Sequence, residues 1–226
     1  MTKNTFSLHI LKDETTSYKS YTYVIIDNKT LETGIIDPAC EKEKLETLIQ
    51  DKGLKPKYIL LTHTHSDHIR QVEWLYKHYQ MQVCLSEIEA HFYDYYMPSM
   101  KLLDDEEKIQ IGNTSIRCIH TAGHSKGSMC YWVGNKLFTG DTLFIEGCGV
   151  CTGIGGDVEE MYNTIQHLKN IILKETEIYP GHRYDAYPGE TFAQMFEKNI
   201  YLLLDAKEDF VNFRMRKNQG NILKFK

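Results

Sequence analysis

The stretch "KYILLTHTHSDH" at 57–68 most constrains how this chain can fold, because metal-type side chains follow directly after an apolar run. Continuous apolar character over 57–63 is typical of a strand buried on both faces. Three histidines and one aspartate then fall within six positions. Imidazoles crowded at a buried strand end are costly unless they have partners. We therefore expect a metal site here, with its other ligands elsewhere in the chain.

The spacing inside this stretch suggests two neighbouring ions. Residues two apart in an extended chain point the same way, so His63, His65 and Asp67 face one side. Ser66 is suited to cap a helix, and His68 at the start of that helix can turn toward a second point. One ion could take His63 and His65, while the other takes Asp67 and His68. Imidazole and carboxylate ligands suit zinc, and also iron or manganese.

Three later stretches place candidate ligands beside a glycine just after an apolar run: "CIHTAGHSKGS", "LFTGDTLF" and "IYPGHRY". They offer His120 and His124, Asp141, and His182. Loops held by a rigid scaffold often carry the chemistry of a protein. Spacing alone leaves open whether His120 or His124 is the metal ligand.

The rest of the pattern alternates strands and helices in two comparable halves. In the first half we expect strands at 6–11, 21–27, 33–37 and 57–63, with a helix over 40–53. In the second half we expect a strand at 81–86, paired strands around turns at 112–113 and 134–135, and a helix at about 157–173. This order predicts an α+β fold, an αββα sandwich with helices on both outer faces.

The C-terminal part reads as helical. From about 190 onward the apolar face of the expected helix is formed by Phe192, Met195, Phe196, Ile200 and Leu203. We expect residues 1–226 to form one domain, with this helical segment at about 190–226.

Composition excludes several classes of function. The 226 residues, 42% hydrophobic and 25% charged, are those of an ordinary soluble protein. A net charge of −5 offers no basic surface for nucleic acid or a membrane. With no export signal or apolar span, we expect a cytoplasmic protein whose six cysteines are reduced thiols. Cys148 and Cys151 form a single C-x-x-C pair, which alone is weak evidence for zinc or redox chemistry.

The motifs "HTHSDH", "TAGHSKG", "FTGDTLF" and "YPGH", in this order over nearly the whole chain, resemble the metallo-β-lactamase fold superfamily. The segment "TGDTLFIEGCG" is especially similar to its glyoxalase II branch. The resemblance implies two zinc ions per chain and excludes His120 as a ligand. The implied ligands are His63, His65 and His124 for one ion, Asp67, His68 and His182 for the other, and Asp141 as the bridge. Ala122 departs from the proline that this family usually carries.

Such a site would generate a nucleophile from water. Two ions sharing a water lower its pKa toward neutrality and supply hydroxide, and one ion can polarise a carbonyl. Asp67 could orient that hydroxide or take its proton. A thioester suits the site because its leaving thiol, with a pKa of about 8.5, departs without much help from an acid.

The loop "EGCGVCTGIGGD" and the C-terminal "PGETF" look most similar to zinc-dependent hydrolases associated with bacterial polyketide synthases. That resemblance implies an acyl thioester carried on the phosphopantetheine of an acyl carrier protein. The alternative is hydroxyacylglutathione hydrolase, glyoxalase II itself. Glyoxalase II relatives commonly have arginine where this chain has Val150, which weighs against recognition of glutathione carboxylates.

Other readings are less consistent with the residues. An iron-dependent persulfide dioxygenase would use one metal through His63, His124 and Asp141. A nuclease is disfavoured by the acidic balance, and a β-lactamase by the lack of an export signal. A non-catalytic relative would have degraded ligands, whereas all seven positions are intact. Oligomeric state, acyl chain and physiological metal are left open.

Overall fold

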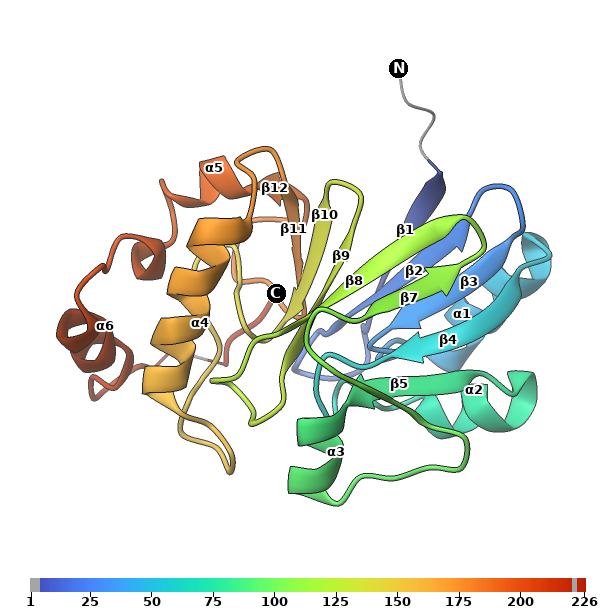
Figure 1. Ribbon diagram of the computed structural model, residues 1–226, viewed down its shortest axis with the longest axis horizontal. Coiled ribbons are helices and arrows are strands. Elements are labelled where there is room, and N and C mark those ends of the chain that lie inside the picture. Colours follow the sequence, from blue (N-terminus) through green and yellow to red (C-terminus); the bar gives the residue numbers. More distant parts are fainter. Residues whose placement is uncertain (1–4, 221–222) are drawn as a thin grey trace.

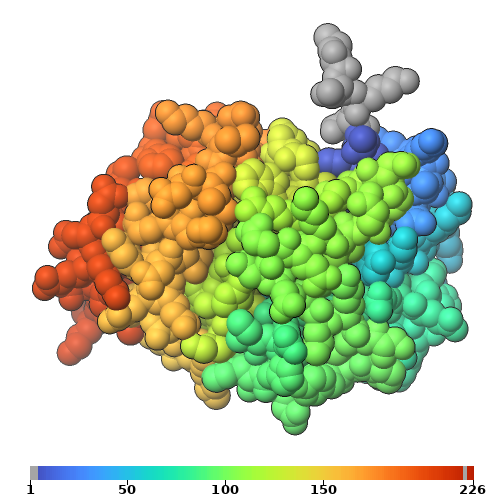
Figure 2. All heavy atoms as spheres, in the orientation of Figure 1, coloured from blue at the N-terminus to red at the C-terminus, as the bar shows by residue number. Residues whose placement is uncertain are grey.

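Two six-stranded sheets pack face to face in the computed structural model, which describes residues 5–220 and 223–226 (Figure 1). Helices cover the outer face of each sheet, which confirms the predicted αββα sandwich. The first half of the chain forms one sheet and its helices, and the second half forms the other. The same division is visible on the surface, where the blue first strands and the orange and red C-terminal helices lie on opposite sides (Figure 2).

The first sheet has the strand order β1-β2-β3-β4-β5-β6. Strands β1 to β3 pair antiparallel, and β3 to β6 pair parallel. The elements of this half are β1 (Phe6–Lys12), β2 (Tyr21–Asp27), β3 (Glu32–Ile36), α1 (Lys42–Asp51), β4 (Lys55–Leu60), α2 (Val72–Tyr79), β5 (Gln82–Ser86), α3 (Glu87–Tyr93) and β6 (Lys101–Leu103).

The second sheet has the order β12-β11-β10-β9-β8-β7, antiparallel except for the parallel pair β10 and β11. The elements of this half are β7 (Lys108–Ile111), β8 (Thr114–His120), β9 (Met129–Val133), β10 (Lys136–Gly140), α4 (Val158–Ile171), β11 (Glu177–Pro180), β12 (Glu190–Thr191), α5 (Phe192–Met195), the 3-10 helix η1 (Ile200–Leu202) and α6 (Lys207–Arg214).

Three apolar clusters hold these four layers together. Alternate side chains of a strand point to opposite faces of the sheet, and β2 shows the consequence. Tyr23 and Ile25 lie in the cluster between the two sheets, whereas Val24 and Ile26 lie in the cluster beneath the helices of the first half. A third cluster joins the second sheet to α4 and the C-terminal helices. Strand β2 is therefore buried on both faces, as a central layer requires.

The two sheets are also tied together where their strands end. Met129 N donates a hydrogen bond to Thr62 O at 2.8 Å, and Tyr21 N donates to Gly181 O at 2.8 Å. Gly181 leaves no room for a side chain, because a Cβ there would lie 2.5 Å from Asp141 Oδ1 and 2.7 Å from His68 Cε1. The glycine beside this ligand motif thus permits a close approach of the two halves.

The histidine-rich segment folds differently from the prediction. Strand β4 ends at Leu60, so His63 lies in the loop beyond it, not in the expected strand over 57–63. The ladder stops because Thr62 N donates to Asp37 Oδ1 at 2.8 Å rather than to a strand. The expected helix start at Ser66 is also wrong, since α2 begins only at Val72. The intervening residues form turns that bond to other loops, as when Gln71 N donates to Pro38 O.

The C-terminal segment is not the single amphipathic helix that its spacing predicted. Asn199 interrupts it by donating to the carbonyls of Phe144 and Gly147, both at 2.9 Å, and by capping Tyr201 N. As a result Ile200 and Leu203, expected on the apolar face, are 42% and 57% exposed. No helix in the described part of the chain is long and apolar enough to cross a membrane.

Candidate metal centre

Three imidazole nitrogens converge where β4 and β8 end. His65 Nδ1 lies 3.1 Å from His63 Nε2 and 3.0 Å from His124 Nε2. The His63 and His124 side chains are buried. Three ring nitrogens that face one another this closely leave little room for protons between them, and they are the ligand type that zinc prefers. These three side chains could hold one metal ion.

A second group of ligand atoms lies beside the first. Asp67 Oδ2 is 3.3 Å from His182 Nε2 and 3.5 Å from His68 Nε2, and the two imidazole nitrogens are 3.3 Å apart. His68 comes from the turn after β4 and His182 from the loop after β11, so the two sheets contribute together. Asp67, His68 and His182 could hold a second ion.

Asp141, directly after β10, lies between the two groups. Its Oδ1 is 3.4 Å from both His68 Nε2 and His182 Nε2, and its Oδ2 is 3.6 Å from His124 Nε2. Oδ1 is buried and has no hydrogen-bond partner among the described residues. Without a hydrogen bond, this buried oxygen is compensated among the described residues by its ion pairs with His68 and His182, and a cation placed between the two groups would take over that role when these imidazoles lose their protons. The donor set and this unpartnered oxygen fit a dinuclear centre.

The ring nitrogens that face away from the centre are held by hydrogen bonds. His68 Nδ1 donates to Asp37 Oδ2 at 2.9 Å, His182 Nδ1 to Tyr18 O at 2.8 Å, and His124 Nδ1 to Val150 O at 2.8 Å. Each bond places the proton on Nδ1 and leaves Nε2 free to bind a metal. Asp37 also lies near His63, yet its carboxylate is already occupied by His68 and Thr62.

Burial and charge give the two groups opposite protonation in the metal-free protein. Burial lowers the pKa of His63 well below its ordinary value and lowers the pKa of His124 to about 4. Burial acts in the same direction at His182, but the charge of Asp141 outweighs it and raises that pKa to about 9. His63 and His124 are therefore neutral at pH 7, while binding of a metal by His182 would release a proton.

A buried glutamate that sequence reasoning missed joins the two ligand loops. Glu89, on α3, is fully buried. Its Oε1 accepts from Thr64 N and Thr64 Oγ1, both at 3.0 Å, and its Oε2 accepts from Ser125 Oγ at 2.9 Å and Gly127 N at 2.8 Å. Thr64 stands between His63 and His65, and Ser125 follows His124. A serine next to a ligand and a glutamate in an apolar helix were the available signals, but neither reveals the contact.

The other candidates lie away from the centre. His120 is half-buried, and its Nε2 is 3.4 Å from Lys126 O. Cys148 and Cys151 are buried and unpaired, as are the other four cysteines. Burial raises the pKa of both thiols, to about 11 for Cys151, so they stay protonated at neutral pH.

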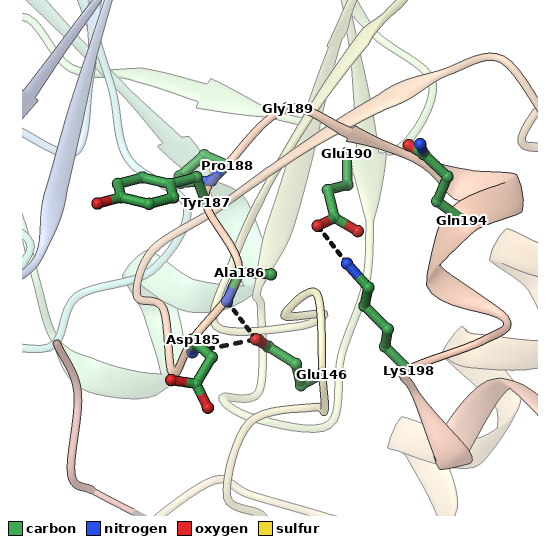
Figure 3. A pocket seen from close by; sticks show the side chains of 9 residues that line it. All are labelled: Glu146, Asp185, Ala186, Tyr187, Pro188, Gly189, Glu190, Gln194 and Lys198. Atoms are coloured by element: carbon green, nitrogen blue, oxygen red, sulfur yellow. Dashed lines mark hydrogen bonds and ion pairs between the residues drawn. The ribbon is translucent and has the colours of Figure 1, made fainter.

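A cavity of about 100 Å³ opens over the metal centre. Ligand side chains form its floor, and Phe144, Tyr184, Leu223 and Phe225 form its apolar sides. A larger hollow, about 700 Å³, lies elsewhere, along the loop from Asp185 to Glu190, and its lining contains no candidate ligand (Figure 3). Chemistry at the metal centre therefore belongs to the smaller cavity.

Two packed sheets that carry adjacent histidine and aspartate groups at their strand ends define the class of metal-dependent hydrolases. The sequence model of the metallo-beta-lactamase superfamily matches residues 16–182, and the chain belongs to this superfamily. It is a metal-dependent hydrolase of that superfamily.

Known relatives span nearly the whole chain. The probable polyketide biosynthesis zinc-dependent hydrolase PksB of Bacillus subtilis (strain 168) is 38% identical over 222 residues, which cover 98% of this chain and 99% of PksB. The hydroxyacylglutathione hydrolase of Buchnera aphidicola is 33% identical over 82% of this chain and 71% of its own length. The crystal structure of ETHE1 from Myxococcus xanthus has the same fold, with a TM-score of 0.85, 23% identity and coverage of 96% and 94% of the two chains.

Proposed function

We propose that this chain hydrolyses an acyl thioester carried on the phosphopantetheine thiol of an acyl carrier protein, as a step of polyketide biosynthesis. The observation that carries the proposal is the position of Asp141. Its unpartnered Oδ1 and its Oδ2 reach toward two separate groups of ligand atoms. We assign two zinc ions to these groups. His63, His65 and His124 would hold one ion, Asp67, His68 and His182 would hold the other, and Asp141, which lies between the two groups, would be shared by both.

Residues around these ions have distinct roles in the reaction. Bound zinc would acidify a water molecule and polarise the thioester carbonyl. Asp67 is the residue that orients this water and accepts its proton. Burial opposes ionisation of Asp67, but the charge of His68 and a hydrogen bond from His182 lower its pKa, so it is a carboxylate at neutral pH. Ser20 Oγ donates to Asp67 Oδ2 at 2.9 Å and fixes the direction of that carboxylate.

The chemistry of the leaving group supports a thioester. Apart from the ligand histidines and aspartates, the described lining of the cavity has no carboxyl, imidazole or ammonium group to protonate a leaving amine or alcohol, and its only other proton-donating side chains are the weakly acidic phenols of Tyr18 and Tyr184. A thiol with a pKa of about 8.5 leaves as a thiolate without such an acid. The cavity therefore suits a thioester better than an amide.

The name of the similar Bacillus subtilis protein supports a place in polyketide biosynthesis, because that relative and this chain match over almost their full lengths. Hydrolysis of hydroxyacylglutathione is the second candidate, favoured by the similarity to the Buchnera aphidicola enzyme. Val150 weighs against it, since the valine that lines the cavity has no charged group for glutathione carboxylates, and its carbonyl accepts from His124 Nδ1.

A thiol-release assay with three substrate classes tests the proposal. Purified zinc-loaded protein is offered acyl thioesters of an acyl carrier protein, of coenzyme A and of glutathione, and the zinc content is measured in the same sample. We expect the acyl carrier protein substrate to give the highest kcat/KM. Release from glutathione thioesters alone would establish the second candidate. Thiol release from none of the three, by protein that holds about two zinc ions, would reject thioester hydrolysis.

Two controls sharpen the assay. His124→Ala should lose zinc and activity, whereas His120→Ala, at the end of β8 just before that loop and away from the centre, should keep both. Oxygen consumption with a persulfide substrate by iron-loaded protein would instead establish the dioxygenase alternative.

A further inference from the structure

The end of the described chain packs on the metal centre. The ring of Phe225 stacks on the imidazole of His182, with centroids 4.1 Å apart and planes inclined by 12°. It also contacts Tyr184 at 5.3 Å and Phe144 at 6.0 Å between centroids. Leu223 lines the same cavity. Two side chains that are distant in sequence from every candidate ligand thus form the outer wall of the metal cavity.

This wall is anchored by the loop that follows His182. Lys226 N donates to Arg183 O at 3.1 Å, and Arg183 Nε donates back to Lys226 O at 3.1 Å. The Lys226 ammonium pairs with Asp185. The loop is held in turn, because Glu146 accepts from the backbone amides of Asp185 and Ala186, as Figure 3 shows. Phe225 therefore has a defined position over the centre.

These contacts fix the position of the Phe225 ring, but they are weak enough to break when a larger group enters the cavity. Lys226 and Asp185 have side chains that are 61% and 79% exposed, so solvent screens their ion pair and the pair contributes little to the anchor. Contact between aromatic rings adds a further attraction to that of their buried area. The wall is thus held mainly by the Phe225 ring, by one backbone hydrogen bond and by one hydrogen bond from the Arg183 guanidinium.

The cavity behind the wall is small for an acyl thioester. Its volume is about 100 Å³, whereas sites for larger ligands span about 300–1,000 Å³. One water molecule corresponds to about 30 Å³, so the cavity accommodates the reacting carbonyl and a short substituent. A longer acyl group meets Phe225 and Leu223.

We propose that Phe225 is a specificity-determining residue, which limits the size of the acyl group at the metal centre and shields the face of His182. The size limit rests on the thioester hydrolysis proposed above, while the shielding does not. Substrates with long or branched acyl groups displace this wall, and that displacement raises their barrier relative to an acetyl thioester.

Acyl-size selectivity is the first readout. The ratio of kcat/KM for octanoyl to acetyl thioesters is measured for the wild type, Phe225→Leu and Phe225→Ala. We expect the ratio to rise about tenfold in Phe225→Ala, equivalent to about 1.4 kcal/mol, and to an intermediate value in Phe225→Leu. Phe92→Ala, at an exposed aromatic residue outside the cavity, serves as the matched control and should leave the ratio unchanged.

Zinc transfer to a colorimetric chelator is the second readout and needs no substrate. Removal of the ring that covers His182 should speed the transfer severalfold in Phe225→Ala but not in Phe92→Ala. If the wild type hydrolyses no thioester, the proposed function fails, and the chelation rates still decide whether Phe225 shields the centre. An unchanged acyl-size ratio in Phe225→Ala would overturn the specificity role, and an unchanged chelation rate would overturn the shielding.

Discussion

His68 and Asp37 form a buried pair in which the imidazole Nδ1 donates to the carboxylate Oδ2 at 2.9 Å. The bond turns His68 Nε2 toward Asp67 and Asp141, where it can bind a metal once its own proton is released. Asp37 has a left-handed backbone, with φ of 45°, and also accepts from Thr62 N and Thr62 Oγ1. One carboxylate therefore orients a ligand and fixes the start of the ligand loop.

Asp37→Asn tests this arrangement while it preserves a residue type that tolerates positive φ. An amide has one acceptor oxygen, so either His68 or the Thr62 backbone must face an NH₂ group. We expect zinc affinity to fall about 10- to 100-fold, measured by competition with a chelator of known affinity. Asp51→Asn, on the exposed side of α1, is the control. Wild-type affinity in Asp37→Asn would show that this hydrogen bond does not tune the centre.

Glu89→Gln tests the connection between the two ligand loops. The carboxylate accepts four hydrogen bonds, and glutamine would turn an NH₂ group toward two donors. Buried donors left unpaired should lower the free energy of unfolding by about 2–4 kcal/mol, and the loops should bind zinc more weakly. Urea unfolding and chelator competition measure the two effects. Glu87→Gln, exposed in the first turn of the same helix, should change neither. A fully stable Glu89→Gln protein would refute the connection.

The hydrogen bonds to Asp27, at the end of the sandwich opposite the metal centre, should make the stability of the fold depend on pH. Its Oδ2 accepts from Asn113 N at 2.8 Å and Thr114 Oγ1 at 3.0 Å, which joins β2 to the β7–β8 turn. Burial opposes the effect, but hydrogen bonds, including those from Thr30, hold the pKa of Asp27 below its usual range. A depressed carboxyl pKa contributes stability above the unfolded value of about 3.9, and this contribution is lost as the pH falls through the folded value.

The corresponding experiment compares the metal-free wild type with Asp27→Asn by urea unfolding at pH 7 and pH 3. The difference in free energy of unfolding should shrink by about 1 kcal/mol at pH 3, because the wild type alone loses the contribution of the ionised carboxylate. Metal-free protein is used so that acid release of zinc does not contribute. An equal difference at both pH values would contradict the role of Asp27.

Much of the architecture was predictable, because each expected strand has a strong local pattern. The turns at 112–113 and 134–135 and the buried run of β2 lead directly to paired strands and a central layer. The absence of a helix start at Ser66 could not be predicted, because a serine before an apolar periodicity also fits the turn that Asp37 and Pro38 hold in place. The interruption of the C-terminal helical segment at Asn199 could not be predicted either, because its hydrogen-bond partners, Phe144 and Gly147, are distant in sequence.

The candidate ligands were predictable because each is adjacent to a glycine or to another ligand after an apolar run. The groups that orient them were not. Asp37, Glu89 and Phe225 reach the centre only through the fold, and their local sequence does not reveal these contacts. Spacing proposed that His63 and His65 share an ion, but the choice of His124 over His120 needed the family resemblance.

The zinc-to-protein ratio of the purified chain, measured by elemental analysis beside His182→Ala and His167→Ala, tests the dinuclear centre most directly. His182 is one of the ligands assigned to the second ion only, whereas His167 is exposed on α4. We predict about two zinc ions in the wild type and in His167→Ala, and about one in His182→Ala, because the first group keeps its three imidazoles. One ion in the wild type, or two in His182→Ala, would contradict the account.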